Sequence, residues 1–271
     1  MAELFVSPDS GFSFGRLFSD AGRVLARGWP VLAVGLLVLG VAPRVATGLP
    51  WWRVAVATPE AQRIALEVTM IKAAINLVAS AALTTFVAAV SLKVLQASAW
   101  RETLAPAPLA LGVATAVCVS LVFGWPSLIA PVVGRWLSPP MMTALAFSGF
   151  FVELALLPFL GVATLSAVAE RRFVPSAFAR SIRLLRGLRW RIAALGAGFI
   201  IALVVSQSLV QIGLAISGVP LSRGPGLARV ALTLSGVLIG SLAGMMFASV
   251  FAQSRRIADG PTAGELHDVF A

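Results

Sequence analysis

Residues 192–222 read IAALGAGFIIALVVSQSLVQIGLAISGVPLS, an uninterrupted stretch without a charged side chain. About 20 predominantly apolar residues are enough for a helix to cross the hydrocarbon core of a bilayer. The stretch lacks the alternation of apolar and polar residues that would favour a half-buried strand. It therefore predicts a membrane-spanning helix over about 191–217.

Other charge-free runs of the chain have the same character. They occupy residues 28–43, 73–92, 103–134, 136–152, 154–169 and 230–254. Because the two runs that flank Glu153 are each short for a span, we interpret them as one helix. The six predicted membrane helices then lie at about 29–49, 70–95, 105–130, 140–168, 191–217 and 229–253.

Composition agrees with this interpretation. Hydrophobic residues make up 59% of the 271 residues and charged residues only 12%, against about 25% charged in soluble domains. The predicted fold is all-α, a polytopic membrane helix bundle with about six transmembrane helices and two amphipathic interfacial helices. Residues 1–254 are expected to form a single transmembrane domain and 255–271 a short cytoplasmic tail.

The formal net charge of +10 would favour nucleic-acid binding in a soluble protein. Here the placement of the charges favours another cause. With both termini in the cytoplasm, about two-thirds of the 21 Lys and Arg residues lie in cytoplasmic segments, as the positive-inside rule expects. We therefore expect a multi-pass protein of the inner (cytoplasmic) membrane with cytoplasmic N and C termini and no nucleic-acid partner.

Two basic segments precede predicted spans and have the pattern of interfacial helices, at about 14–28 and 175–189. In the first, an apolar stripe at helical spacing lies opposite most of the charged residues. In the second, Phe178, Ile182, Leu185 and Leu188 are expected on one side and the arginines on the other. Basic faces of this kind attract anionic lipid. The residues expected to contact lipid at the membrane surface are Arg180, Arg183, Arg186, Arg189, Trp190, Arg23, Arg27 and Trp29.

Glu153 is the best sequence candidate for a functional polar group, because it falls near the middle of the span predicted at 140–168. A carboxylate at that depth is costly and is expected to face the bundle interior or a wet cavity. Asn76, Gln207 and Gln211 are the nearest polar candidates by depth. Two interpretations of Glu153 stay open: a proton or substrate role, or a neutral, hydrogen-bonded structural acid.

Small residues recur at four-residue spacing in the last two predicted spans. Gly236, Gly240 and Gly244 lie on one face of the last span, and Gly198 belongs to a similar stripe on the preceding one. Such stripes let helix backbones approach closely in lipid. We expect the two stripes to face each other.

Signatures of catalysis and metal binding are almost absent from the sequence. Residues 11–15, GFSFG, match the nucleophile-elbow pattern, but no strand is predicted before them and the only histidine is His267. One His and one Cys cannot build the usual zinc sites, and no Walker or dinucleotide-binding glycine loop occurs. The sequence predicts no enzyme activity, no cofactor and no metal.

Three juxtamembrane motifs point to a family: FSFGRLFSDAGRVLARGW at 12–29, AVAERRFVPSAFARSIRLLRGLRWRI at 167–192 and GELHDVFA at 264–271. In this order the chain resembles the bacterial six-helix proteins grouped with the glycerophosphoryl diester phosphodiesterase membrane-domain family. In that family an acidic residue ends one helix, and a basic helix and a Gly-x-Arg-Trp-like entrance to the next follow. The matching positions here are Glu170, Arg180, Ser181, Arg186, Gly187, Arg189 and Trp190. The chain departs from the pattern at 251–254, where a tyrosine-containing stretch is common.

The resemblance implies a bacterial membrane domain that is sometimes fused to a soluble phosphodiesterase, for which this chain has no room. We therefore expect a non-catalytic membrane or envelope scaffold or accessory protein that contacts anionic membrane lipid. The alternative is a small transporter or lipid-handling protein that uses the bundle interior around Glu153. A homo-oligomer or a membrane-protein partner is compatible with both.

Overall fold

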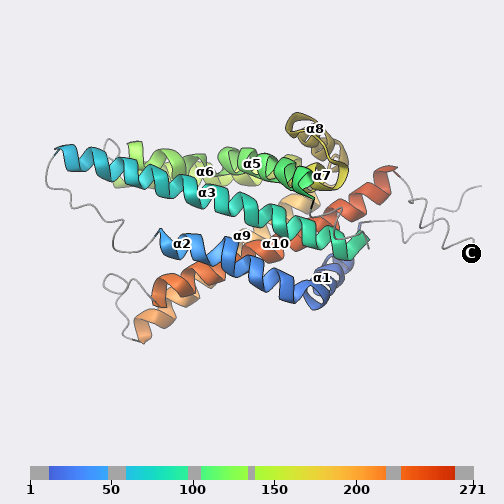
Figure 1. The fold of residues 1–271 in the computed structure, drawn as a ribbon, viewed down its shortest axis with the longest axis horizontal. Coiled ribbons are helices and arrows are strands. Elements are labelled where there is room, and N and C mark those ends of the chain that lie inside the picture. Colours follow the sequence, from blue (N-terminus) through green and yellow to red (C-terminus); the bar gives the residue numbers. More distant parts are fainter. Residues whose placement is uncertain (1–11, 48–58, 97–104, 134–137, 218–226, 260–271) are drawn as a thin grey trace, which may run out of the picture.

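The computed structural model describes residues 12–47, 59–96, 105–133, 138–217 and 227–259 (Figure 1). Within these ranges every regular element is a helix and none is a strand, which confirms the all-α class. The elements are α1 (Phe14–Gly35), the π-helical turn η2 (Leu36–Val41), α2 (Ala42–Ala46), α3 (Pro59–Gln96), α5 (Pro106–Val133), α6 (Pro139–Leu160), α7 (Ala163–Glu170), α8 (Val174–Leu184), α9 (Arg189–Ile216) and α10 (Leu227–Asp259).

Four of the described helical segments are long and apolar enough to cross a membrane. They are Phe14–Ala46, Arg63–Gln96, Arg189–Ile216 and Val230–Asp259, with mean hydropathies of 2.0, 1.9, 2.2 and 1.9. A shorter apolar segment, Pro106–Val122, lies in α5. These lengths and hydropathies are those of a membrane protein.

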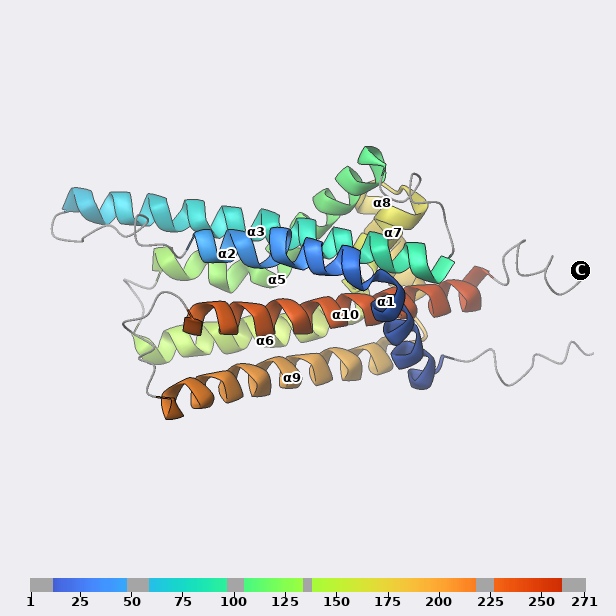
Figure 2. The same cartoon turned by 60° about the horizontal axis from the view of Figure 1, so that its bottom comes forward.

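The N-terminal run differs from the prediction of an interfacial helix at 14–28 followed by a separate span. The helix continues without a break from α1 through η2 into α2, although its first turns are inclined to the rest (Figure 2). Pro30 lies inside α1. Proline has no backbone N–H, so inside a helix it usually causes a bend or a break. Here the helix continues past Pro30. The amphipathic segment is thus the first part of α1 rather than an element of its own.

The helix predicted at 140–168 is also divided differently. It breaks at residues 161–162 into α6 and the short α7. Pro158 removes a backbone donor near this point, and Gly161 packs so closely that an added Cβ would lie 2.7 Å from the Phe247 ring and 2.9 Å from the Leu157 carbonyl oxygen. The break lets α7 enter the core, where residues 163–168 are all buried.

The chain reverses between α7 and α8 at Arg171, which has a left-handed φ of 52° and ends α7. In α8 the buried residues are Ala177, Ser181 and Leu184, and Ile182 is 40% exposed. Of the predicted apolar side, Leu185 is fully buried, Phe178 and Leu188 are half-buried and only Ile182 is exposed, because α8 itself packs on the protein through its small residues. The Ser181 hydroxyl donates to the Phe159 carbonyl at 2.7 Å and fixes this orientation.

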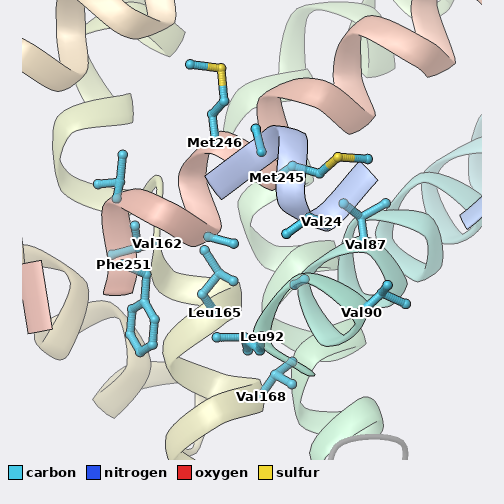
Figure 3. Close-up of a cluster of buried hydrophobic side chains, with 14 of the residues drawn as sticks. Val24, Val87, Val90, Leu92, Val162, Leu165, Val168, Met245, Met246 and Phe251 are labelled. Carbon is cyan, nitrogen blue, oxygen red and sulfur yellow. The ribbon is translucent and has the colours of Figure 1, made fainter. Parts of the chain in front are cut away.

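The elements α7, α8, the start of α1 and the last turns of α10 meet at one end of the bundle (Figures 1 and 2). Many of the buried side chains belong to these elements. Figure 3 shows Val24, Val87, Leu165 and Phe251 in this core, contributed by α1, α3, α7 and α10. We call this region the packed end. By contrast, no residue in the most apolar 18-residue window of α9 is buried, as expected of a helix on the outside of a membrane bundle.

Candidate functional site

Exposed arginines and an exposed tryptophan lie close together in the middle of α1. Leu17, Ala21 and Val24 of the predicted apolar stripe are buried, whereas Phe18 and Leu25 of the same stripe are 65% and 47% exposed. Arg23 and Arg27 are exposed, and Trp29 is 61% exposed. Arginine beside an exposed indole is typical of the membrane interface, where the ring lies at headgroup level and the cation contacts phosphate.

A second group of exposed cations lies on α8 and at the start of α9, at the same end of the molecule (Figure 1). Arg183, Arg186 and Arg189 are exposed, and Trp190 is 88% exposed. The Arg189 guanidinium carbon also lies 4.7 Å from the centroid of the Phe159 ring. We call the two groups together the basic rim, with members Arg23, Arg27, Trp29, Arg183, Arg186, Arg189 and Trp190.

Arg180 does not belong to the basic rim, contrary to the expectation that it contacts lipid. Its side chain is only 14% exposed, and its Nε lies 3.1 Å from Glu170 Oε1. Its Nη2 also donates to a carboxylate oxygen of Asp259. The hydrogen bond to Asp259, assisted by the neighbouring Glu170 carboxylate, raises the pKa of Arg180. Arg180 is a structural cation that joins three helices.

Around Arg180 lies an ionic cluster made of Glu170, Arg172, Arg180, Arg255 and Asp259. The Glu170 side chain is 10% exposed and accepts from Arg172 Nε. Arg255 Nε lies 4.0 Å from Glu170 and 3.7 Å from Asp259. A carboxylate removed from water needs such partners, because an uncompensated buried charge is strongly destabilising. The cluster ties α7 and α8 to the last turn of α10.

A polar network fixes the other half of the basic rim to α10. The Ser249 hydroxyl donates to Asp20 at 2.6 Å, and the Ser13 backbone N–H donates to Gln253 Oε1 at 3.0 Å. Arg191 extends the network by donating to the Phe12 carbonyl at 3.1 Å. Helix α10 thus holds both rim segments, one through hydrogen bonds and the other through the ionic cluster.

The structure does not bring the described intramembrane polar candidates together. Asn76 Nδ2 donates to Thr47 Oγ1 at 3.3 Å, next to α2. Gln207 Nε2 donates to the Leu232 carbonyl at 3.0 Å, on α10, while Gln211 is exposed. Glu153 belongs to α6, but its side chain lies outside the described part of the structure.

The glycine stripes do not form one continuous seam between α9 and α10. A Cβ on Gly236 would lie 3.3 Å from Gln207 of α9, but one on Gly244 would meet Val87 of α3 at 3.0 Å. A Cβ on Gly240 or Gly198 would meet nothing within 4 Å. Gly236 therefore packs beside α9 and Gly244 beside α3, whereas Gly240 packs closely against neither helix.

Gly112 of α5, which the sequence pattern did not indicate, makes one of the close interhelical glycine contacts among the described residues. A Cβ on Gly112 of α5 would lie 2.5 Å from Thr85 Cγ2 of α3 and 2.6 Å from Val168 Cγ2 of α7. Gly112 is an isolated glycine in an apolar helix, so no periodic signal distinguishes it. Its role follows from the meeting of three helices.

A partly open cavity of about 120 Å³ lies where α2, α3 and α10 meet, and sequence analysis did not single it out. We call it the Arg44 pocket. Its lining residues are Arg44, Ser80, Leu83, Thr84, Val87, Gly236, Val237, Gly240, Ser241 and Gly244. Arg44 lies in the helical run Phe14–Ala46 and is half-buried. Its Nη2 donates to Ser80 Oγ at 2.6 Å.

The described residues contain no group of three or more His, Cys, Asp or Glu side chains arranged to hold a metal ion. Comparisons with protein-family models, with curated proteins and with solved structures find no match to this chain. Proposals about function therefore rest on the geometry of the basic rim, the ionic cluster and the Arg44 pocket.

Proposed function

We propose that the protein is a non-catalytic integral membrane protein that acts as a scaffold or accessory protein and binds anionic lipid through its basic rim. In this proposal the protein has six spans, which are the four long apolar segments named above, α5, and α6 together with α7. The membrane is the bacterial inner membrane, and both termini face the cytoplasm. Membership of the glycerophosphoryl diester phosphodiesterase membrane-domain family is likewise a prediction, made from the sequence motifs.

The observation that carries this proposal is the pairing of exposed arginines with exposed tryptophans on two segments at one end of the bundle. Trp29 and Trp190 are among the most exposed large side chains. Each follows exposed arginines by a few residues. Basic residues near an anionic leaflet contribute about 1 kcal/mol each to membrane binding, and an indole beside them fits the headgroup region.

The rigid attachment of both rim segments to α10 supports a scaffold. The ionic cluster and the Ser13–Gln253 hydrogen bond hold the segments at fixed positions, so the lipid-facing groups are preorganised and lose little conformational entropy on binding. The basic end is placed in the cytoplasm by the positive-inside rule.

The test uses the double variant Arg183→Gln with Arg186→Gln, because both side chains are exposed and lie outside the ionic cluster. At about 1 kcal/mol per arginine, the affinity of the segment for an anionic surface is expected to fall roughly tenfold or more. Hydrogen exchange of residues 178–191 is compared in nanodiscs of phosphatidylcholine with and without phosphatidylglycerol. We expect phosphatidylglycerol to increase protection in the wild type and not in the double variant.

A matched control removes an arginine at the other end of the molecule. Arg63→Gln affects an exposed pair, in which the Arg63 and Glu67 side chains are 82% and 57% exposed. It is expected to leave the protection of 178–191 unchanged. Equal protection in wild type and double variant would contradict lipid binding by the rim.

The alternative of a transporter that uses the interior around Glu153 also stays a prediction. Its test is the substitution Glu153→Gln in a protein that still folds, followed by measurement of uptake into proteoliposomes. Transport by the wild type that is abolished in the variant would favour this alternative over the scaffold.

A further inference from the structure

The Arg44 pocket combines a cation with hydroxyl groups and glycines inside a membrane-spanning region. Ser80 and Thr84 are one turn apart on α3 and line one wall. Gly236, Gly240 and Gly244 line the opposite wall, on α10. Because glycine has no side chain, this wall leaves space beside the guanidinium. Thr84 and Gly240 are exposed, so the pocket opens between α3 and α10.

The position of the guanidinium is fixed by two hydrogen bonds. Arg44 Nη1 donates to the Gly40 carbonyl at 2.6 Å, and Nη2 donates to Ser80 Oγ at 2.6 Å. Gly40 belongs to the π-helical turn η2. Wider turns of this kind loosen the regular backbone hydrogen bonding and recur at functional sites. The turn therefore supplies an acceptor that orients Arg44 into the pocket.

The charge of Arg44 is not compensated by any carboxylate in the part of the chain that the structure describes. A guanidinium has five N–H donors, and two hydrogen bonds of this side chain are formed. An ionised side chain within a span is costly and is usually paired, or marks a path or binding site. Arg180, by contrast, has two carboxylate partners.

We propose that the Arg44 pocket binds a phosphate group. The remaining guanidinium N–H groups match phosphate oxygens with charge-assisted hydrogen bonds, and the Ser80 hydroxyl, which accepts from Arg44, keeps its own hydrogen to donate. A volume of about 120 Å³ is several times the roughly 10–15 Å³ that a cavity needs to hold one water molecule. That suits a phosphate group, and the rest of a larger molecule would leave between Thr84 and Gly240.

Two sources can supply this group: the headgroup of a membrane phospholipid, or a soluble phosphate. The site is separate from the basic rim, so it does not rest on the proposed function. Variants of the pocket leave Arg183 and Arg186 in place, and failure of one proposal can be distinguished from failure of the other.

The experiment uses two variants that damage the pocket in different ways. Arg44→Gln removes the charge. Gly240→Leu fills the space while retaining Arg44, and it is tolerated sterically at its Cβ, which would meet nothing within 4 Å. Gly198→Leu is the matched control, because its Cβ also meets nothing within 4 Å and Gly198 does not line the pocket. Arg63→Gln is the control for loss of an arginine.

The full chain is purified in a neutral detergent and titrated with phosphatidylglycerol in one arm and inorganic phosphate in the other. Bound lipid is counted by native mass spectrometry, and phosphate binding is measured by calorimetry. Each variant is checked for wild-type helicity by circular dichroism. We expect saturable binding of one phosphate group to the wild type, with affinity lowered on the order of tenfold to a hundredfold by Arg44→Gln and by Gly240→Leu, and unchanged in both controls.

Phosphatidylglycerol binding that is weakened by Arg44→Gln and Gly240→Leu, without binding of inorganic phosphate, identifies a lipid as the source and is distinct from binding at the basic rim. Binding of inorganic phosphate that is weakened by the same variants and competes with the lipid identifies a soluble phosphate. The proposal is overturned if neither probe binds the wild type at a saturable site. It is also overturned if a folded Gly240→Leu variant binds both probes as tightly as Gly198→Leu does.

Discussion

Arg180 and Arg44 are partly buried arginines in two different regions of the molecule, and different groups stabilise the charge of each. At the packed end, Arg180 lies between Glu170 and Asp259. In the Arg44 pocket, the cation is held by a carbonyl and a hydroxyl, and no described carboxylate neutralises it. The difference teaches that a paired arginine supports the fold, whereas an unpaired one is available to a ligand.

The space around glycine residues also differs between the two regions. At the packed end a Cβ on Gly112 would meet side chains of two helices at 2.5 and 2.6 Å, while at the pocket a Cβ on Gly240 would meet nothing within 4 Å. One region has no room for an added methyl group, and the other has room for several atoms. A larger side chain is therefore expected to destabilise the protein at Gly112 and to be tolerated at Gly240.

The largest effect is expected from Arg180→Gln, which removes the cation shared by Glu170 and Asp259. Loss of one partner from a buried pair destabilises by about 3 kcal/mol, because the other charge is left uncompensated. Unfolding in mixed micelles by sodium dodecyl sulfate measures the change. A double-mutant cycle with Glu170→Gln should show strong coupling, since the two groups act as a unit; additive effects would mean that the cluster does not stabilise the fold.

An intermediate effect is expected from adding volume at the two glycines. Gly112→Val would overfill the contact of α3, α5 and α7 and is expected to destabilise by about 1 to 3 kcal/mol. The same substitution at Gly240 extends into open space and avoids this overpacking, apart from the lower helix propensity of a β-branched residue. The same unfolding assay compares the two, and equal destabilisation would erase the contrast in packing.

The smallest effect on stability is expected from Arg44→Gln. Removing the cation loses two hydrogen bonds of about 1 kcal/mol each, but it also removes the desolvation cost of an unpaired charge. The free energy of unfolding should change by less than about 1 kcal/mol, well below the change for Arg180→Gln. A loss as large as that of Arg180→Gln would show that Arg44 is mainly structural.

Much of the helical organisation could be predicted from the sequence, because long charge-free runs have one stable form in a bilayer. The predicted spans at 29–49, 70–95, 191–217 and 229–253 fall largely in α1 to α2, α3, α9 and α10. The break at 161–162 could not be predicted, because hydropathy does not register the close contact of Gly161 with Phe247. The continuity of α1 through Pro30 was missed because proline more often starts a helix than lies within one.

The candidate sites were predictable only in part. The apolar stripe of α1 was correct at Leu17, Ala21 and Val24. Beside α8, Leu185 is buried as its pattern suggested, whereas Ile182 is exposed because α8 packs through Ala177 and Ser181. Arg180 looked equivalent to Arg183 and Arg186 in the sequence. Its carboxylate partners come from positions 170 and 259, at separations that no local pattern connects.

Charge-free runs and clustered arginines by themselves determined that this protein is helical and apolar enough for a membrane, since both depend on the local transfer of side chains between water and lipid. Tertiary structure alone decided which arginine is neutralised and which is not. Arg44 and Arg180 differ in the residues that other helices bring near them, and electrostatic compensation acts only over the few ångströms that packing sets.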